Sequence, residues 1–160
     1  MTIQVGDKIP SITLKRLGAD GMEEITTDSI FKGRSVVLFS VPGAFTPTCS
    51  AKHLPGFIMK SDEFKGKGID EIVCLAVNDP FVMKAWGEQA GAGDKILMLP
   101  DGNGTFTRAL GLEMDGSGYG LGQRGKRFAL VAKDGTVTKL AVEPPGAFGV
   151  SSADEVLAAL

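Results

Sequence analysis

One stretch of the chain joins a strand, a tight turn and a helix start. Ser35–Val41 is a continuous run of aliphatic, β-branched and aromatic residues, which is typical of a strand buried on both faces of a sheet. After the turn at Pro42-Gly43, Thr46 is a good N-cap and Pro47 suits the first helical position. Cys49 then falls in the first helical turn, where unpaired amides and the positive helix end favour a thiolate over a thiol. This stretch therefore predicts a nucleophilic cysteine, in preference to the alternative of a small buried apolar residue, the commonest role of a lone intracellular cysteine.

The chain on either side of this stretch predicts an α/β fold. Helical spacing of apolar residues continues from Cys49 to about Lys65, with a kink expected near Pro55, and Ile69–Val77 is a second buried run. A strand, a helix and a strand in succession predict a parallel pair with a right-handed crossover. The remaining expected elements are an edge strand at 12–15, a helical turn at 27–31, helices at 80–89, 105–110 and 153–160, a strand at 96–99, a glycine-rich loop at 112–125, and a hairpin at 127–132 and 136–142.

Length and charge limit the possible functions. The 160 residues fit one domain, residues 1–160, and the net charge of −2 gives no basic field for nucleic acid. No apolar stretch approaches the roughly 20 residues that span a bilayer. The N-terminal residues lack the regions of a signal peptide, so we expect a cytoplasmic protein, although a processed organellar form has the same features. Small soluble molecules are the expected partners.

Other motifs give no cofactor or metal site. Gly120–Gly125 formally matches the dinucleotide fingerprint, but it precedes a strand instead of opening a helix. The two cysteines, Cys49 and Cys74, and the one histidine, His53, lack the spacing of a zinc site. Cys74 lies in the middle of a strand, where an inert buried thiol is expected. His53 shares a helical face with Cys49, so it is either a base or, as we favour, a structural residue.

The segment around Cys49 carries a family resemblance. A cysteine pair of the thioredoxin type needs a cysteine where Thr46 stands, and the motif Pro42-x-x-x-Thr46-x-x-Cys49 instead resembles that of the peroxiredoxins. The run 41–50, VPGAFTPTCS, is similar to the atypical, peroxiredoxin-5 (type II) subgroup. The blocks at 53–57, 77–81 and 126–128 resemble the same subgroup, so the likeness covers the whole chain.

The resemblance implies a thioredoxin-like fold, with a central mixed β-sheet flanked by helices, and a thiol peroxidase that reduces hydrogen peroxide and small alkyl hydroperoxides. It makes Cys49 the peroxidatic cysteine, which becomes a sulfenic acid. It makes Thr46 its hydroxyl partner and Arg127 the arginine that steadies thiolate and peroxide. It places the substrate against Pro42, Gly43 and Thr48. Arg124 is a weaker candidate for the same neighbourhood.

Several points stay open at this stage. The segment 145–151 has no resolving cysteine, which resembles the plant and bacterial branch, so regeneration is expected from glutaredoxin with glutathione, or from thioredoxin. A homodimer is expected, with Phe45, Phe81 and Trp86 as apolar surface near Cys49; the alternative is that these aromatic residues belong to the core. The rival interpretation is a non-enzymatic redox sensor or a chaperone-like binder. Among enzymes, a disulfide reductase or an activity like that of glutathione peroxidase is the alternative.

Overall fold

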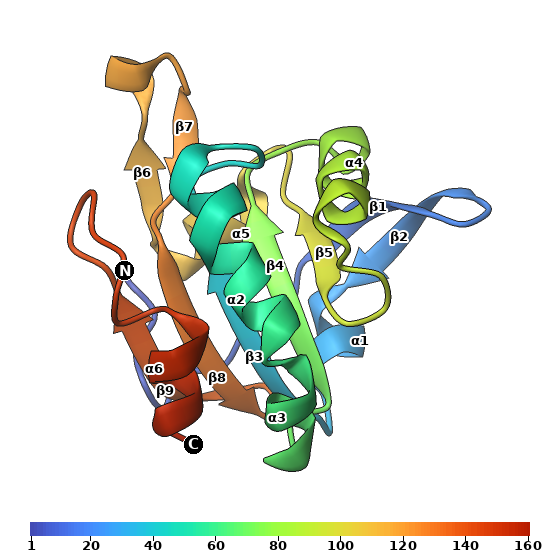
Figure 1. Ribbon diagram of the computed structural model, residues 1–160, viewed down its shortest axis with the longest axis vertical. Coiled ribbons are helices and arrows are strands. Elements are labelled where there is room, and N and C mark those ends of the chain that lie inside the picture. Colours follow the sequence, from blue (N-terminus) through green and yellow to red (C-terminus); the bar gives the residue numbers. More distant parts are fainter.

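The structure, a computed structural model, describes residues 1–160 and is organised around a five-stranded mixed sheet (Figure 1). The first three of these strands along the chain are parallel to one another. The final two along the chain form an antiparallel hairpin, which pairs antiparallel with the strand Ser35–Ser40. This α/β arrangement, including the parallel pair that flanks the Cys49 segment, is the one predicted from the sequence. In spatial order the strands are β5 (Leu97–Pro100), β4 (Glu71–Ala76), β3 (Ser35–Ser40), β8 (Phe128–Lys133) and β9 (Thr136–Val142).

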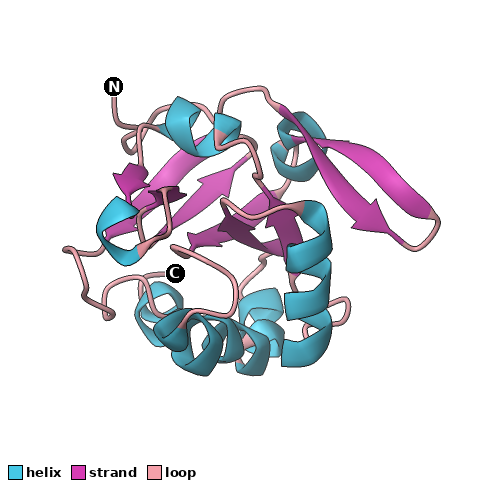
Figure 2. Cartoon of the chain, turned by 90° about the horizontal axis from the view of Figure 1, so that it is seen from above, coloured by secondary structure: helices cyan, strands magenta, loops and turns pink.

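Helices cover both faces of the sheet, as the view from above shows (Figure 2). Alternate residues of β3 serve the two layers, because successive side chains of a strand point to opposite faces. Val37 and Phe39 join one apolar cluster, and Val36 and Leu38 join the other. The first cluster includes residues of α2 (Leu54–Met59), α3 (Ser61–Gly66), α4 (Pro80–Ala90) and α6 (Ala153–Ala158), and the second includes residues of α1 (Thr27–Phe31) and α5 (Thr105–Leu110).

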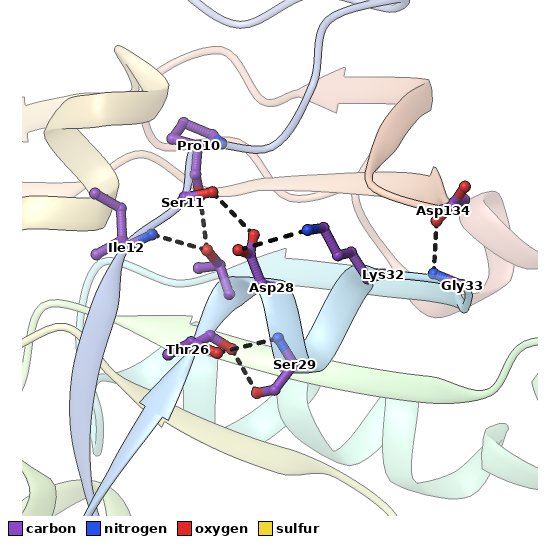
Figure 3. A network of polar contacts seen from close by, with 10 residues as sticks. Pro10, Ser11, Ile12, Thr26, Asp28, Ser29, Lys32, Gly33 and Asp134 are labelled. Atoms are coloured by element: carbon purple, nitrogen blue, oxygen red, sulfur yellow. Dashed lines mark hydrogen bonds and ion pairs between the residues drawn. The ribbon is translucent and has the colours of Figure 1, made fainter.

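Helix α1 is held at the end of β3 that lies away from Cys49 (Figure 3). The Thr26 hydroxyl accepts from the Ser29 amide, and the Thr27 hydroxyl donates to the Pro10 carbonyl while accepting from the Ile12 amide. These bonds satisfy the first turn of a helix too short to be stable alone. They fix the entry of the chain into β3.

Predicted helix and turn signals are confirmed at three places. Asp79 caps α4 by accepting from the Val82 amide at 2.8 Å, and Ser152 caps α6 by accepting from the amide of Glu155. The β8–β9 turn has positive φ at both Asp134 and Gly135, the backbone that a type I′ hairpin requires.

The predicted glycine-rich loop at 112–125 is wrong in part, because two short strands, β6 (Glu113–Asp115) and β7 (Gln123–Gly125), pair antiparallel there. The edge strand predicted at 12–15 extends as β1 (Thr13–Gly18), and it pairs with an unpredicted partner, β2 (Gly21–Thr26). This separate hairpin projects from the body of the molecule (Figures 1 and 2). None of the helices has the length and apolar character required to cross a membrane.

Candidate active site

The chain between β3 and the first helical turn is shaped by local hydrogen bonds. Phe45 has a φ of 63°, a left-handed conformation that is uncommon for a large side chain. On one side of it, the Ala44 amide donates to Asn78 Oδ1 at 2.9 Å. On the other, the Thr46 hydroxyl donates to the Gly43 carbonyl at 2.7 Å. The bend at Phe45 is thus stabilised from both sides, which fixes the direction in which the helix leaves.

Thr46 occupies the predicted cap position but uses its side chain differently. Its carbonyl accepts the first intrahelical bond, from the Ser50 amide at 2.9 Å. Its hydroxyl, however, donates to Gly43 and makes no capping bond to a helix amide, so this part of the prediction is wrong. The hydroxyl oxygen keeps its lone pairs for another donor.

Cys49 begins a π-helical turn, Cys49–His53, which overlaps the segment 51–55 where the sequence predicts a kink. Proline has no N–H to offer the carbonyl four residues earlier. The Leu54 amide, one residue earlier, donates to the Cys49 carbonyl five residues back, which is the π-helical pattern. The chain then continues into α2. The turn carries Cys49 and His53 toward the same arginine, Arg127.

Arg127 reaches the cysteine from the other half of the sequence. The residue immediately precedes β8, and in the antiparallel pair of β3 and β8 the register joins Ser40 to Phe128. Arg127 therefore lies beside the end of β3, next to the turn that leads to Cys49. Its Nη2 donates to Cys49 Sγ at 3.0 Å.

The structure also places the other residues that the sequence singled out. Pro42, Thr48 and Arg127 line a cavity of about 250 Å³, together with Met114, Lys126 and the segment 143–147, whereas Gly43 is not part of this lining. Arg124 contacts the loop that leads from β3 to Cys49, because its Nη1 lies 3.4 Å from the Pro42 carbonyl oxygen. Cys49 itself is fully buried.

Cys74 and Trp86 are both in the core. Cys74 is fully buried in β4, and burial raises the pKa of its thiol well above the ordinary value, with the nearby Cys49 raising it further. The prediction of an inert thiol at Cys74 thus fits its surroundings. Trp86 is only 1% exposed and its indole N–H donates to the Ser50 hydroxyl, so the prediction of an exposed Trp86 surface is wrong. Phe45 and Phe81 are exposed, as expected for that surface.

Two residues that the sequence did not indicate complete the surroundings of Arg127. The Phe148 ring lies 5.8 Å from the Arg127 guanidinium carbon and 5.1 Å from the His53 ring. The Glu143 carboxylate accepts hydrogen bonds from the segment that carries Phe148. Both residues lie in an irregular segment far along the chain, so no local pattern connects them to Cys49.

A buried cysteine touched by an arginine, on a mixed sheet with helices on both faces, defines a thiol-based redox protein. Residues 4–157 match the family described as Redoxin. The chain is 56% identical to peroxiredoxin-2E-2 of Oryza sativa subsp. japonica, over 99% of this chain and 73% of that protein. It is 50% identical to peroxiredoxin-2B of Arabidopsis thaliana, over 99% of this chain and 98% of that protein.

Solved structures agree. A structure described as reduced Prx3 in complex with H2O2, from Vibrio vulnificus, has a TM-score of 0.94 and 51% identity, with 99% of each chain covered. Peroxiredoxin 5 from Alvinella pompejana has a TM-score of 0.86 and 37% identity, with 98% of this chain and 96% of that chain covered. The chain belongs to the peroxiredoxins, within the type II and peroxiredoxin-5 group, and has their thioredoxin-like fold. It is a thiol peroxidase, and the comparisons favour this function over a non-enzymatic sensor or binder.

Proposed function

We propose that Cys49 is the peroxidatic cysteine and that the chain reduces hydrogen peroxide and small alkyl hydroperoxides. The observation that carries this assignment is the 3.0 Å contact between Arg127 Nη2 and Cys49 Sγ. The Vibrio relative described as a complex with H2O2 supports the choice of substrate. The volume of the adjoining cavity, about 250 Å³, exceeds that of hydrogen peroxide, which supports room for a short alkyl group.

In the proposed reaction the Cys49 thiolate attacks one peroxide oxygen. A sulfur–oxygen bond forms, the oxygen–oxygen bond breaks, and the leaving oxygen takes a proton and departs as water or an alcohol. The sulfur is oxidised to a sulfenic acid while the peroxide is reduced. Arg127 donates to the sulfur and to the charge that spreads over the reacting oxygens.

The loop before Cys49 orients the peroxide. The Thr46 hydroxyl donates its hydrogen to the Gly43 carbonyl, so its oxygen lone pairs are free. The oxygen therefore accepts a hydrogen bond from the peroxide. Pro42 and Thr48 form the cavity wall that the substrate contacts. Holding the two oxygens in line with the sulfur lowers the entropic part of the barrier.

An external thiol completes the cycle. The sulfenic acid condenses with one thiol to give a mixed disulfide and water, and a second thiol releases Cys49 and leaves as a disulfide. Glutaredoxin with glutathione, or thioredoxin, supplies these thiols. Cys74 is an unsuitable resolving residue, since its fully buried thiol is held in the protonated form and lies on a central strand.

The proposal also covers the assembly of the protein and its location in the cell. Phe45 and Phe81, which are 48% and 62% exposed, support a homodimer that buries them beside the active-site loop. The proposed location is the cytoplasm. Two of the plant relatives are described as chloroplastic, which agrees with a processed organellar form as the alternative.

Peroxide consumption by purified wild type, Cys49→Ser and Cys74→Ser tests these assignments. With glutaredoxin plus glutathione, and separately with thioredoxin, we expect turnover in wild type and Cys74→Ser and none in Cys49→Ser. Mass spectrometry after one equivalent of peroxide should find a sulfenic acid on Cys49, or a glutathione adduct when glutathione is present. Turnover by Cys49→Ser contradicts the peroxidatic assignment. A Cys49–Cys74 disulfide in wild type, with turnover lost in Cys74→Ser, contradicts external resolution alone.

A further inference from the structure

Arg127 is held by a second residue that the proposed reaction does not use. Its Nη1 lies 2.7 Å from His53 Nδ1, while its Nη2 donates to Cys49. The other ring nitrogen, His53 Nε2, lies 2.9 Å from the Ser151 carbonyl oxygen. Arginine can only donate and a carbonyl can only accept, so Nδ1 must be the acceptor and Nε2 must carry the hydrogen. The two contacts therefore fix one neutral tautomer of His53.

The surroundings of His53 keep the ring in this neutral form. The side chain is fully buried, with ring centroids of Phe39, Phe57 and Phe148 at 4.9, 5.7 and 5.1 Å. Burial, together with the charge of Arg127, lowers the pKa of His53 to about 3. Hydrogen bonding to Ser151 and the charge of Glu143 act in the opposite direction without restoring it. His53 is thus available as an acceptor for Arg127 throughout the physiological pH range.

Ser151, which accepts from His53, is itself held in place by Glu143. One carboxylate oxygen of Glu143 accepts from the Gly149 amide at 2.6 Å, the Ser151 amide at 2.8 Å and the Ser151 hydroxyl at 2.7 Å. Burial alone raises the pKa of Glu143, but these hydrogen bonds outweigh it and lower the pKa, so the carboxylate stays charged. The backbone amide of Glu143 donates to the carbonyl of Arg127 itself at 3.0 Å.

These contacts close a ring that starts and ends at the arginine. It runs from Arg127 to His53, from His53 to Ser151, from Ser151 to Glu143, and from Glu143 back to Arg127. A guanidinium group tethered at one nitrogen and fixed at its own backbone has little freedom to rotate. The free nitrogen then stays directed at the sulfur. Without the tether, a long side chain with several rotatable bonds samples other directions.

We infer that His53 is a positioning residue for the peroxidase reaction: it accepts from Arg127 Nη1 and so directs Nη2 at the Cys49 sulfur, while Glu143 holds the segment on which His53 rests. This inference depends on the proposed function, because it concerns the rate at which Cys49 meets peroxide. It assigns His53 no proton transfer. The residue acts on the sulfur only through Arg127.

Two substitutions separate the two bonds of His53. In His53→Asn, the amide oxygen replaces Nδ1 and can still accept from Arg127, while the contact with Ser151 is lost. In His53→Gln, the longer side chain can place its amide nitrogen near Ser151, which leaves Arg127 without its acceptor. His53→Leu removes both bonds. Phe64→Leu is the control for weakened packing, because Phe64 lies in the same apolar cluster and stacks on Phe57, one ring removed from His53.

Two measurements report on the sulfur. The first is the rate constant of Cys49 oxidation by hydrogen peroxide, followed by stopped-flow fluorescence of the single tryptophan, Trp86, which donates to Ser50 next to Cys49. The second is the pH at which alkylation of Cys49 by iodoacetamide reaches half its maximal rate, measured in a Cys74→Ser background. The free energy of unfolding of every variant is measured in urea.

We expect His53→Asn to stay within about threefold of the wild-type oxidation rate. His53→Gln and His53→Leu should lose between about tenfold and a hundredfold, the cost of a small misplacement of a catalytic group. The alkylation midpoint should move to higher pH in the Gln and Leu variants and stay in place in Phe64→Leu, even where Phe64→Leu is the less stable protein. Glu143→Gln, which keeps an acceptor but removes the charge, should shift both readouts in the same direction as His53→Gln, by a smaller amount.

Equal rates and equal alkylation midpoints in wild type and His53→Gln overturn the inference. Losses that follow the free energy of unfolding across all variants, with an unchanged alkylation midpoint, overturn it as well, because they describe a structural residue. If the histidine variants do not fold, Glu143→Gln is the deciding variant. An oxidation rate and an alkylation midpoint equal to those of wild type in Glu143→Gln then overturn the inference. Failure of the proposed function is distinguishable, since wild type itself then consumes no peroxide.

Discussion

Arg127 Nη2 lies 3.0 Å from Cys49 Sγ although 78 positions separate the two residues in the chain. The contact depends on the antiparallel register of β3 and β8, which sets the residue before β8 beside the end of β3. The cysteine thus receives its arginine contact from the opposite half of the fold. The sheet register is a condition for the chemistry.

Arg127→Lys should slow the oxidation of Cys49 by about a hundredfold to a thousandfold, the usual cost of removing one fixed donor from a reacting centre. A lysine ammonium is a point charge on a flexible stem and cannot donate to His53 and Cys49 in one fixed plane. The measurement is the stopped-flow rate constant with hydrogen peroxide. Arg108→Lys is the matched control, since Arg108 is an exposed arginine on α5, and its rate should equal that of wild type. A comparable loss in both variants contradicts a specific role for Arg127.

Stability should fall in mild acid because of His53. Its pKa is about 3 in the folded chain and about 6.5 in the unfolded chain. Between these values the unfolded state binds a proton that the folded state does not, so the free energy of unfolding decreases as the pH falls from 6.5 towards 3. The slope is at most about 1.4 kcal/mol per pH unit, or about 2 kcal/mol between pH 7 and pH 5.

Urea unfolding of wild type and His53→Asn at pH 7, 6 and 5 measures this effect. The wild type should lose more stability than the variant over this range, because asparagine does not titrate. Glu143, whose pKa is lowered, adds acid destabilisation of the same sign in both proteins, beginning below the value of about 4.5 that an unperturbed glutamate has. Parallel curves for the two proteins between pH 7 and pH 5 contradict a buried neutral His53.

The proposed homodimer should depend on the exposed aromatic residues beside the active-site loop. In Phe81→Ser and Phe45→Ser, the loss of buried apolar area weakens association, so sedimentation at micromolar concentration should shift from dimer toward monomer. Met59→Ser is the control, since Met59 is an apolar side chain that is 81% exposed at the end of α2, outside the active-site loop. A wild type that sediments only as a monomer, or aromatic variants that remain dimeric, contradicts this assembly.

The sheet could be predicted from the sequence, and Cys49 could be singled out as a candidate, because both have local signals. The continuous apolar run of β3, the Pro42-Gly43 pair and the proline at position 47 are adjacent to one another, although the turn itself lies two residues later than predicted, at Ala44-Phe45. The two positive φ angles of the β8–β9 turn likewise follow from Asp134-Gly135. Each of these features is decided by neighbouring residues, so a single sequence carries enough information.

Features without a clear local signal were not predictable in the same way. β6 and β7 are three residues each, and glycines between them hide the pairing. β2 carries two adjacent glutamates, and its pairing with β1 places one of them, Glu24, 3.1 Å from the Lys15 ammonium. The role of Glu143 depends on a segment that folds back onto Arg127, and nothing in the local pattern around it indicates this.

The last prediction concerns Gly43, which stands where the active-site loop meets a second arginine. A Cβ atom at this position would lie 2.8 Å from Arg124 Nη1 and 3.3 Å from Thr46 Cγ2. Arg124 cannot withdraw freely, since its Nε donates to the Leu121 carbonyl at 2.9 Å and its Nη1 approaches the Pro42 carbonyl. Gly43→Ala should therefore displace Arg124, disturb Thr46 and slow the oxidation of Cys49 by about tenfold, since small shifts of positioning groups carry costs of this size or larger.

A double-mutant cycle identifies the source of that loss. If the clash with Arg124 dominates, Gly43→Ala combined with Arg124→Ala should be faster than the product of the two single effects allows, because removing the arginine side chain makes room for the new methyl group. If the loss comes from the pressure on Thr46 alone, the two effects should multiply. The measurement is the rate constant of oxidation by hydrogen peroxide for the four proteins of the cycle. Independent effects would show that Arg124 does not limit the space at Gly43.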